Sequence, residues 1–271
     1  MNADQVKAIL KDTFNKVAGV YDDRVLRFFP ASARCLADLL RLRGDERVLD
    51  VATGTGHVAL ELAARLPRGQ VAGVDFSTGM LEQARKKAAL CGVNNVEFAE
   101  MDMQDLRFEA ASFDAATCAF GIFFVEDMES ALARIAAKVK PGGTVALCNF
   151  QKDYFLPLRK LLTDRLAAYG VPLPPQTWER IANESGCRAL FETAGLRNVR
   201  TEVRNMGYFL ADANEWWNVV WNAGFRRLLS QLPPADLPRF RTEHLCEVAD
   251  LKTKDGLWLD IGVLFTIGET R

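Results

Sequence analysis

One stretch of the sequence decides the fold: Val48-Leu49-Asp50-Val51-Ala52-Thr53-Gly54-Thr55-Gly56. Its first four residues are apolar except for one acid, and they predict a strand that is covered on both faces of a sheet. The glycines end the apolar run, and residues 58–63 have helical spacing and good helix formers. The stretch therefore predicts a strand, a glycine turn and a helix N-terminus, a junction at which a ligand can approach the backbone closely.

Two classes of cofactor use such a turn, and the residues around it favour one of them. The run from Gly54 to Ala59 satisfies the dinucleotide fingerprint G-x-G-x-x-A, and Asp75 follows about 20 residues later, where an acid would accept ribose hydroxyls. Asp50 adds a carboxylate inside the strand, which an NAD site does not need. A cofactor with a free α-ammonium group needs such an anion in a dry crevice, and S-adenosylmethionine has this group. An NAD-dependent oxidoreductase stays as an alternative.

Five stretches in this order resemble the motifs of the class I S-adenosylmethionine-dependent methyltransferases. They are Asp50–Gly56, with Ala52 where many members have glycine, Val74–Ser77 with Met80-Leu81 behind it, Glu100–Met103, Phe113–Phe120 and Lys140–Gly143. Their sequences are most similar to those of the small-molecule branch that includes the ubiquinone and menaquinone C-methyltransferases. The resemblance implies an α/β fold, with a Rossmann-like, seven-stranded, mostly parallel sheet and helices on both faces.

The same resemblance implies helical lid inserts at the N-terminus and in the C-terminal half, which cover the pocket and select the substrate. We expect residues 1–44 to form an N-terminal helical cap and residues 45–150 to form the S-adenosylmethionine-binding core. Residues 151–271 would complete the sheet and carry the substrate-cap inserts. All three parts would belong to one compact domain.

The resemblance also implies which residues contact S-adenosylmethionine. Asp75 would accept hydrogen bonds from both ribose hydroxyls, Asp102 would accept the adenine amino hydrogens, and Tyr21 would close the pocket. For Tyr21 an ordinary half-buried aromatic with a wet hydroxyl is an equal alternative. The full expected set is Tyr21, Asp50, Ala52, Thr53, Gly54, Gly56, Asp75, Phe76, Met80, Asp102, Met103, Ala119 and Phe120.

The end of the fourth expected strand indicates the class of acceptor. It reads Ala119-Phe120-Gly121-Ile122-Phe123-Phe124, and it lacks the Asn/Asp-Pro-Pro-aromatic loop with which DNA methyltransferases hold an exocyclic amine. A base-flipping enzyme is therefore not expected, and the phenylalanines suit a flat apolar or aromatic acceptor. Phe123 and Phe124 could equally pack against the next helix, whereas we expect Phe120 at the site.

Methyl transfer to carbon or oxygen also calls for candidates for a general base. The reaction is an in-line displacement at a sulfonium, and an oxygen or carbon acceptor can need a proton removed. The candidates are His57, His244 and Tyr21, with Tyr208 as a further one. His57 follows the glycine turn but could equally face solvent, and His244 lies in a lid-like insert, so no single base is assigned.

Composition narrows the class of protein. The chain has 271 residues, of which 49% are hydrophobic, and a formal net charge of -1, so we expect neither nucleic acid nor an anionic membrane as partner. It has no run of about 20 apolar residues, and residues 1–5 lack a basic-then-apolar signal pattern, so we expect a cytoplasmic protein without stable membrane insertion. The expected partner is a small-molecule acceptor, and a homodimer is left open.

Cysteines and histidines do not form a metal-binding pattern. The six cysteines include no C-x-x-C pair and the chain has two histidines, so we expect no metal. Cys118 and Cys148 lie in strand-like runs, which predicts small residues of a reduced core.

The regions flanking the five motifs predict the remaining elements. Gly19 and Pro30 would divide the N-terminal region into about three helical pieces, and strands six and seven would run near residues 199–208 and 257–267. Between these strands lies an insert with helically spaced tryptophans, Trp216, Trp217 and Trp221, followed on the same helix by Arg226 and Arg227. A carboxylate-bearing substrate could use these arginines.

The sequence therefore predicts an S-adenosylmethionine-dependent methyltransferase (EC 2.1.1.-) that acts on carbon or oxygen of a small apolar or aromatic acceptor. A module that binds S-adenosylmethionine without catalysing a reaction is a second alternative, because intact acids at the cofactor positions do not prove turnover.

Overall fold

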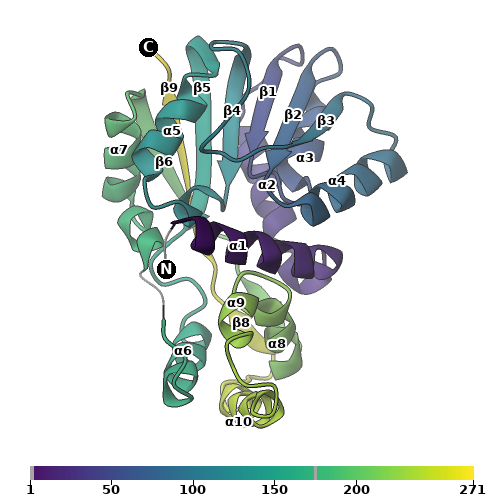
Figure 1. Ribbon diagram of the computed structural model, residues 1–271, viewed down its shortest axis with the longest axis vertical. Helices are drawn as coiled ribbons and strands as arrows, with labels where there is room; N and C mark the ends of the chain where they lie inside the picture. The colour runs from purple at the N-terminus through teal and green to yellow at the C-terminus, as the bar shows by residue number, and fades with distance from the viewer. Residues whose placement is uncertain (1–2, 174–175) are drawn as a thin grey trace. The chain divides into compact units, whose positions relative to one another are not determined.

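A computed structural model describes residues 3–173 and 176–271, and these residues form two compact units (Figure 1). The sheet unit contains Phe29–Lys152, Thr177–Arg204 and Val263–Arg271. The helical unit contains Met1–Phe28, Asp153–Gln176 and Asn205–Gly262, apart from residues 1–2 and 174–175, which lie outside the described part. Each unit draws on separate stretches of the chain, while the expected division at residues 44 and 150 follows chain order and stays a prediction.

The sheet unit is built on seven strands in the order β3-β2-β1-β4-β5-β9-β6. The glycine-turn strand β1 pairs in parallel with β2 on one side and β4 on the other, while β5 and β9 are antiparallel. The seven-stranded, mostly parallel sheet predicted from the sequence is confirmed. The strands are β1 (Arg47–Val51), β2 (Gln70–Asp75), β3 (Val96–Glu100), β4 (Phe113–Ala119), β5 (Val139–Phe150), β6 (Arg197–Asn205) and β9 (Gly262–Glu269).

Helices cover both faces of this sheet (Figure 1). Ser77 caps α4 as its sequence position suggests, because its hydroxyl accepts the Met80 N–H at 3.2 Å. The Asp127 carboxylate caps α5 in the same way by accepting the Ser130 N–H at 2.9 Å. The helices are α2 (Phe28–Leu40), α3 (His57–Arg65), α4 (Thr78–Leu90), α5 (Met128–Ala136) and α7 (Glu184–Thr193), with short 3-10 turns at η3 (Ile122–Phe124) and η4 (Thr177–Ile181).

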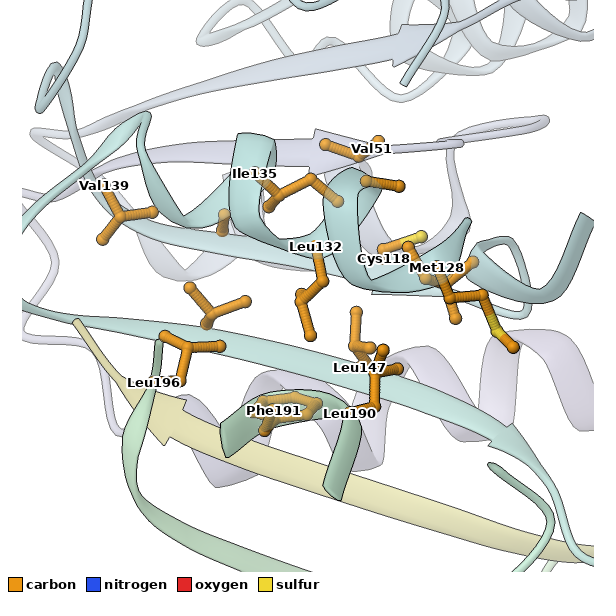
Figure 2. Packing of buried hydrophobic residues seen from close by; sticks show 14 of the residues in the cluster. Val51, Cys118, Met128, Leu132, Ile135, Val139, Leu147, Leu190, Phe191 and Leu196 are labelled. Carbon is orange, nitrogen blue, oxygen red and sulfur yellow. The ribbon is translucent and has the colours of Figure 1, made fainter. Parts of the chain in front are cut away.

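The main apolar core of the sheet unit lies between the sheet and the helices α5 and α7. Leu132 of α5, Leu147 of β5 and Phe191 of α7 are among its fully or almost fully buried members, and Figure 2 shows Leu132 extending from α5 toward the other two. Cys118 also belongs to this core, as predicted, and burial raises the pKa of its thiol. Each such side chain contributes roughly 1.5–3 kcal/mol to the stability of the fold through its removal from water. This core therefore holds the strands of the sheet, and with them their ends, in place.

The helical unit has its own core around Trp216, which is fully buried. The Phe155 ring meets the Trp216 ring edge to face at 5.8 Å, and the His244 ring lies 6.4 Å from the Trp216 ring, measured between centroids. No helix in the described residues has the length and apolar character needed to cross a membrane. The elements are α1 (Ala3–Val17), η1 (Ala18–Val20), η2 (Arg24–Leu26), α6 (Leu158–Ala168), α8 (Ala213–Trp221), α9 (Arg226–Leu229) and α10 (Leu237–Ala249), with a two-stranded sheet of β7 (Tyr208–Leu210) and β8 (Leu257–Leu259).

Two predictions about helices were wrong. Pro30 does not break a helix but is the third residue of α2, where the first-turn N–H groups have no intrahelical partner and proline is tolerated. Arg226 and Arg227 begin the separate helix α9 instead of continuing α8.

Two predictions about strands were also wrong, because each expected strand is divided. The run near residues 199–208 forms β6 and β7, since the Asn205 side chain accepts the Gly207 N–H at 2.7 Å and turns the chain. The run at residues 257–267 likewise forms two strands, β8 and β9.

Candidate functional site

The glycine turn after β1 contains three residues in the left-handed conformation. Ala52, Gly54 and Gly56 have φ angles of 54°, 54° and 83°. The Thr53 N–H donates to the Val74 carbonyl oxygen at 2.9 Å, which ties the turn to the neighbouring strand β2. A Cβ atom built on Gly54 would meet nothing within 4 Å, so the space beside its backbone is open. The turn thus presents bare backbone next to the start of α3, which suits a bound ligand.

Ala52 is an unusual residue for a left-handed conformation, and the absence of a side chain at Gly121 leaves room for its methyl group. A left-handed residue with a Cβ costs about 1–2 kcal/mol, a cost that a glycine at this position would avoid. A Cβ on Gly121 would lie 2.6 Å from the Ala52 Cβ and 3.0 Å from the Cys118 sulfur. Residue 121 must therefore be small, because the Ala52 methyl and the Cys118 sulfur occupy the space beside it.

Asp50 lies beneath the turn and is almost completely buried. Its carboxylate accepts hydrogen bonds from the Thr53 hydroxyl at 2.6 Å, from the Thr117 hydroxyl at 2.7 Å and from the Ala59 N–H. Burial raises the pKa of Asp50 to about 6, although these hydrogen bonds oppose the shift. Asp50 joins β1, β4 and the first turn of α3, a supporting arrangement that the sequence did not suggest.

Asp75 ends β2 and holds the same turn from the other side. One carboxylate oxygen accepts the Gly54 N–H at 2.8 Å and the other accepts the Ser77 N–H at 2.9 Å. Burial also raises the pKa of Asp75 to about 6, against the hydrogen bonds from these amides and from Phe76. The second strand's acid therefore lies beside the glycine turn, at the edge where open α/β sheets bind ligands.

The loop after β3 completes this edge of the sheet. The Met101 N–H donates to the Asp75 carbonyl oxygen at 3.0 Å, and the half-buried Asp102 accepts the Gln104 N–H at 2.9 Å. The structure therefore groups the expected cofactor residues of the sheet unit at the carboxyl ends of four adjacent strands. They are Asp50, Ala52, Thr53, Gly54, Gly56, Asp75, Phe76, Met80, Asp102, Met103, Ala119 and Phe120.

Five phenylalanines form an aromatic cluster at the ends of β4 and β5: Phe29, Phe120, Phe123, Phe124 and Phe150. Phe120 has a φ of 51°, and its ring contacts Phe150 at 4.6 Å and the edge of Phe29 at 5.3 Å. Phe123 is 4.8 Å from Phe124 and 6.4 Å from Phe150, measured between ring centroids. Sequence reasoning missed Phe29 and Phe150, although Phe150 ends the strand next to Phe120 and could have been found from that position.

The three candidate bases have different surroundings. His57 is the half-buried first residue of α3, directly after the glycine turn. Tyr21, in the helical unit, follows η1 and meets the Phe14 ring edge to face at 6.4 Å. His244 is fully buried in the helical unit, and its Nε2 accepts the Trp216 Nε1–H at 2.9 Å. Burial lowers the pKa of His244 to about 4, and these surroundings favour a packing role.

Known proteins resemble this chain in sequence and in fold. Residues 48–143 match a family described as a methyltransferase domain. A demethylmenaquinone methyltransferase from Thermus thermophilus is 34% identical over 213 residues, which cover 72% of this chain and 95% of that protein. A ubiquinone/menaquinone biosynthesis C-methyltransferase from Geotalea daltonii is 36% identical over 158 residues, which cover 56% of this chain and 67% of that protein. The YcgJ protein from Bacillus subtilis has the same fold, with a TM-score of 0.61 and 23% sequence identity. The match covers 89% of this chain and 98% of that protein.

The pair Ala52 and Gly121 gives a prediction about packing. Gly121→Ala should lower the free energy of unfolding by about 1–3 kcal/mol, because the new methyl overlaps Ala52 and Cys118. Ala52→Gly in the same chain should restore about 1 kcal/mol of this loss. Urea unfolding of the two single variants and the double variant measures the coupling, with Gly19→Ala as the control because a Cβ there meets nothing. Strict additivity would contradict the close contact.

The raised pKa of Asp50 predicts a pH dependence of stability. Because the pKa is about 6 in the fold and 3.8 ordinarily, the stabilising contribution of the protonated form is complete below pH 3.8 and is lost as the pH rises through 6. An asparagine side chain cannot titrate, so the free energy of unfolding of Asp50→Asn relative to the wild type should rise by about 1 kcal/mol between about pH 5 and pH 7.5. Urea unfolding at both pH values measures it, with exposed Asp105→Asn as the control. A difference that does not change with pH would rule out the buried, titrating Asp50.

Proposed function

Because the chain belongs to the class I S-adenosylmethionine-dependent methyltransferases of the ubiquinone/menaquinone C-methyltransferase type, we propose that it methylates a carbon atom of a small hydroxyaromatic, quinol-like acceptor. The observation that carries the proposal is the match to demethylmenaquinone methyltransferase along nearly the whole of that protein. Membership of this family makes the chain a methyltransferase enzyme with S-adenosylmethionine as its cofactor. It also removes the support for an NAD-dependent oxidoreductase.

The residues at the glycine turn fit S-adenosylmethionine. Open space beside Gly54 admits a ligand to the backbone, and the turn is held from below by Asp50 and from the side by Asp75. When bound, the cofactor supplies a methyl group made electrophilic by the sulfonium. The turn would take the methionine part, and the chain's task is to hold that part in one orientation.

Three acids have separate proposed roles toward the cofactor. Asp75 accepts ribose hydroxyls, for which its carboxylate exchanges part of its present bonding to backbone amides. Asp102 accepts the adenine amino hydrogens from its half-buried place after β3. Asp50 supplies negative charge near the ammonium group while Thr53 and Thr117 hold its oxygens, so it acts through the turn. The other proposed contacts are Tyr21, Ala52, Thr53, Gly54, Gly56, Phe76, Met80, Met103, Ala119 and Phe120.

The aromatic cluster supports a flat, apolar acceptor. Its rings are half-buried or buried and lie at the ends of β4 and β5, beside the strand ends that carry the cofactor residues. Phe120 and its neighbours exclude water there, which favours a reaction in which positive charge disperses from sulfur. Offset aromatic contacts with these rings would also hold a planar ring in place.

A hydroxyaromatic carbon becomes a stronger nucleophile when its hydroxyl loses a proton. His57 is the histidine of the sheet unit and lies directly after the glycine turn, so it is the preferred candidate for this base. Tyr21 stays a candidate, and His244 is disfavoured by the hydrogen bond from Trp216 and its low pKa of about 4. We also retain a small-molecule acceptor as the partner and a cytoplasmic location, with a homodimer left open and nucleic acid not expected.

Binding and turnover test the proposal together. Asp75→Asn keeps the size of the side chain but loses its charge, so its affinity for S-adenosylhomocysteine should fall by about tenfold or more. Titration calorimetry measures this, with Asp105→Asn, an exposed acid of the loop after β3, as the matched control. NADH should not bind either protein. An unchanged affinity in Asp75→Asn would disprove the role given to this acid.

For turnover, the wild-type protein should convert S-adenosylmethionine and reduced 2-prenyl-1,4-naphthoquinone into a product with a methyl on the ring carbon, identified by mass spectrometry and NMR. A methyl on oxygen would overturn the choice of carbon. Cofactor binding without any methylated product would favour the non-catalytic module over the enzyme.

A further inference from the structure

The helical unit contains a stacked pair of tryptophans with a guanidinium on one of them. The rings of Trp217 and Trp221 lie 5.6 Å apart and within 22° of parallel. The guanidinium carbon of Arg226 lies 3.5 Å from the centre of the Trp221 ring. A guanidinium this close to the face of an indole is attracted by the ring, and its planar N–H donors can meet a carboxylate with two parallel hydrogen bonds.

Arg226 and the next residue, Arg227, are half-buried and lack an acidic partner among the described residues. In that part of the chain, Arg226 has one long hydrogen bond of 3.5 Å to the Trp221 carbonyl oxygen, and neither arginine forms an ion pair. Burial lowers the pKa of both side chains, with no nearby carboxylate to oppose the shift. Partly burying a charge in this way is unfavourable unless an anion approaches it.

Two other arginines of the same unit have acidic partners, whereas Arg27 and Arg241 lie over aromatic rings as Arg226 does. Arg165 pairs with Glu243 and Glu247, and Arg24 pairs with Glu215. Arg24 and Arg165 thus form ion pairs with carboxylates of the chain, whereas the two arginines of α9 form none among the described residues. The difference indicates that the anion for α9 comes from outside the chain.

We propose that Arg226, oriented by Trp221, and the adjacent Arg227 bind the carboxylate of an aromatic acid. Guanidinium groups match the flat, two-oxygen shape of a carboxylate, and Trp221 is half-buried, so an apolar ring can contact the part of the indole that is still exposed. The binding of this acid to the helical unit does not depend on the proposed function.

Calorimetric titration of the whole protein, saturated with S-adenosylhomocysteine, tests the site with matched probes. The acid probe is 1-hydroxy-2-naphthoate, and 1-naphthol has the same ring and hydroxyl without the carboxylate. The wild type should bind the acid at least about tenfold more tightly than the naphthol. Arg226→Gln and Arg227→Gln should each remove most of this preference and leave naphthol binding unchanged. Arg227→Lys keeps the charge and covers the case in which a glutamine variant fails to fold.

Controls separate the aromatic acid from other sources of negative charge. Arg239→Gln, an exposed arginine of α10 in the same unit, should keep the full preference. Inorganic phosphate should neither bind with comparable affinity nor compete with the acid, because equal binding would mean an unspecific anion site. Loss of S-adenosylhomocysteine affinity in Arg226→Gln or Arg227→Gln would mean that these residues hold the cofactor's carboxylate, which overturns the proposal.

The two proposals can fail separately. Equal binding of acid and naphthol by the wild type would overturn this inference, even if the protein binds S-adenosylhomocysteine and methylates a neutral quinol. Absence of S-adenosylhomocysteine binding to the wild type would instead overturn the proposed function.

Discussion

Two buried carboxylates hold the glycine turn, and the rest of the candidate site depends on them. Asp75 accepts the Gly54 N–H from the end of β2, while Asp50 accepts the hydroxyls of Thr53 and Thr117 from beneath. Both acids have a pKa of about 6 because burial disfavours their charge. The fold therefore keeps two acids under electrostatic strain at neutral pH, and a cationic ligand at this edge would relieve it. These two buried acids therefore lower the stability of the fold at the same place where the cofactor is proposed to bind.

The backbone carries strain at the same edge. Ala52 after β1 and Phe120 after β4 both have positive φ, which disfavours residues with a Cβ. β1 and β4 are neighbouring parallel strands, so the two residues leave the sheet side by side. The conformation at Ala52 exposes the turn, and that at Phe120 sets its ring against Phe29 and Phe150. The close packing of the sheet against α5 and α7 offsets this strain, since the strand ends cannot move without disturbing that core.

The sequence predicts the sheet unit well because its signals are local. Apolar runs mark the strands, and the order of the acids and glycines places Asp50, Asp75 and Asp102 at one edge. The sequence does not reveal that the Thr117 hydroxyl, 67 residues away, donates a hydrogen bond to Asp50. That hydrogen bond depends on β1 and β4 being neighbours in the sheet. The division between β6 and β7 was missed for a similar reason, since the turn at Asn205 also depends on its side chain donating to Asp260, 55 residues on.

The residues that match the methyltransferase family all belong to one of the two units. The family match covers residues 48–143, all within the sheet unit, and this stretch contains the backbone turn and its acids. The helical unit carries the stacked tryptophans and the arginines of α9, which serve no cofactor motif. Those side chains can change without altering the hydrogen bonds described for Asp50 and Asp75, because the donors of these bonds all belong to the sheet unit. The side chains of the helical unit thus lie outside the family match, and they can differ between relatives while the hydrogen bonds of the glycine turn stay the same.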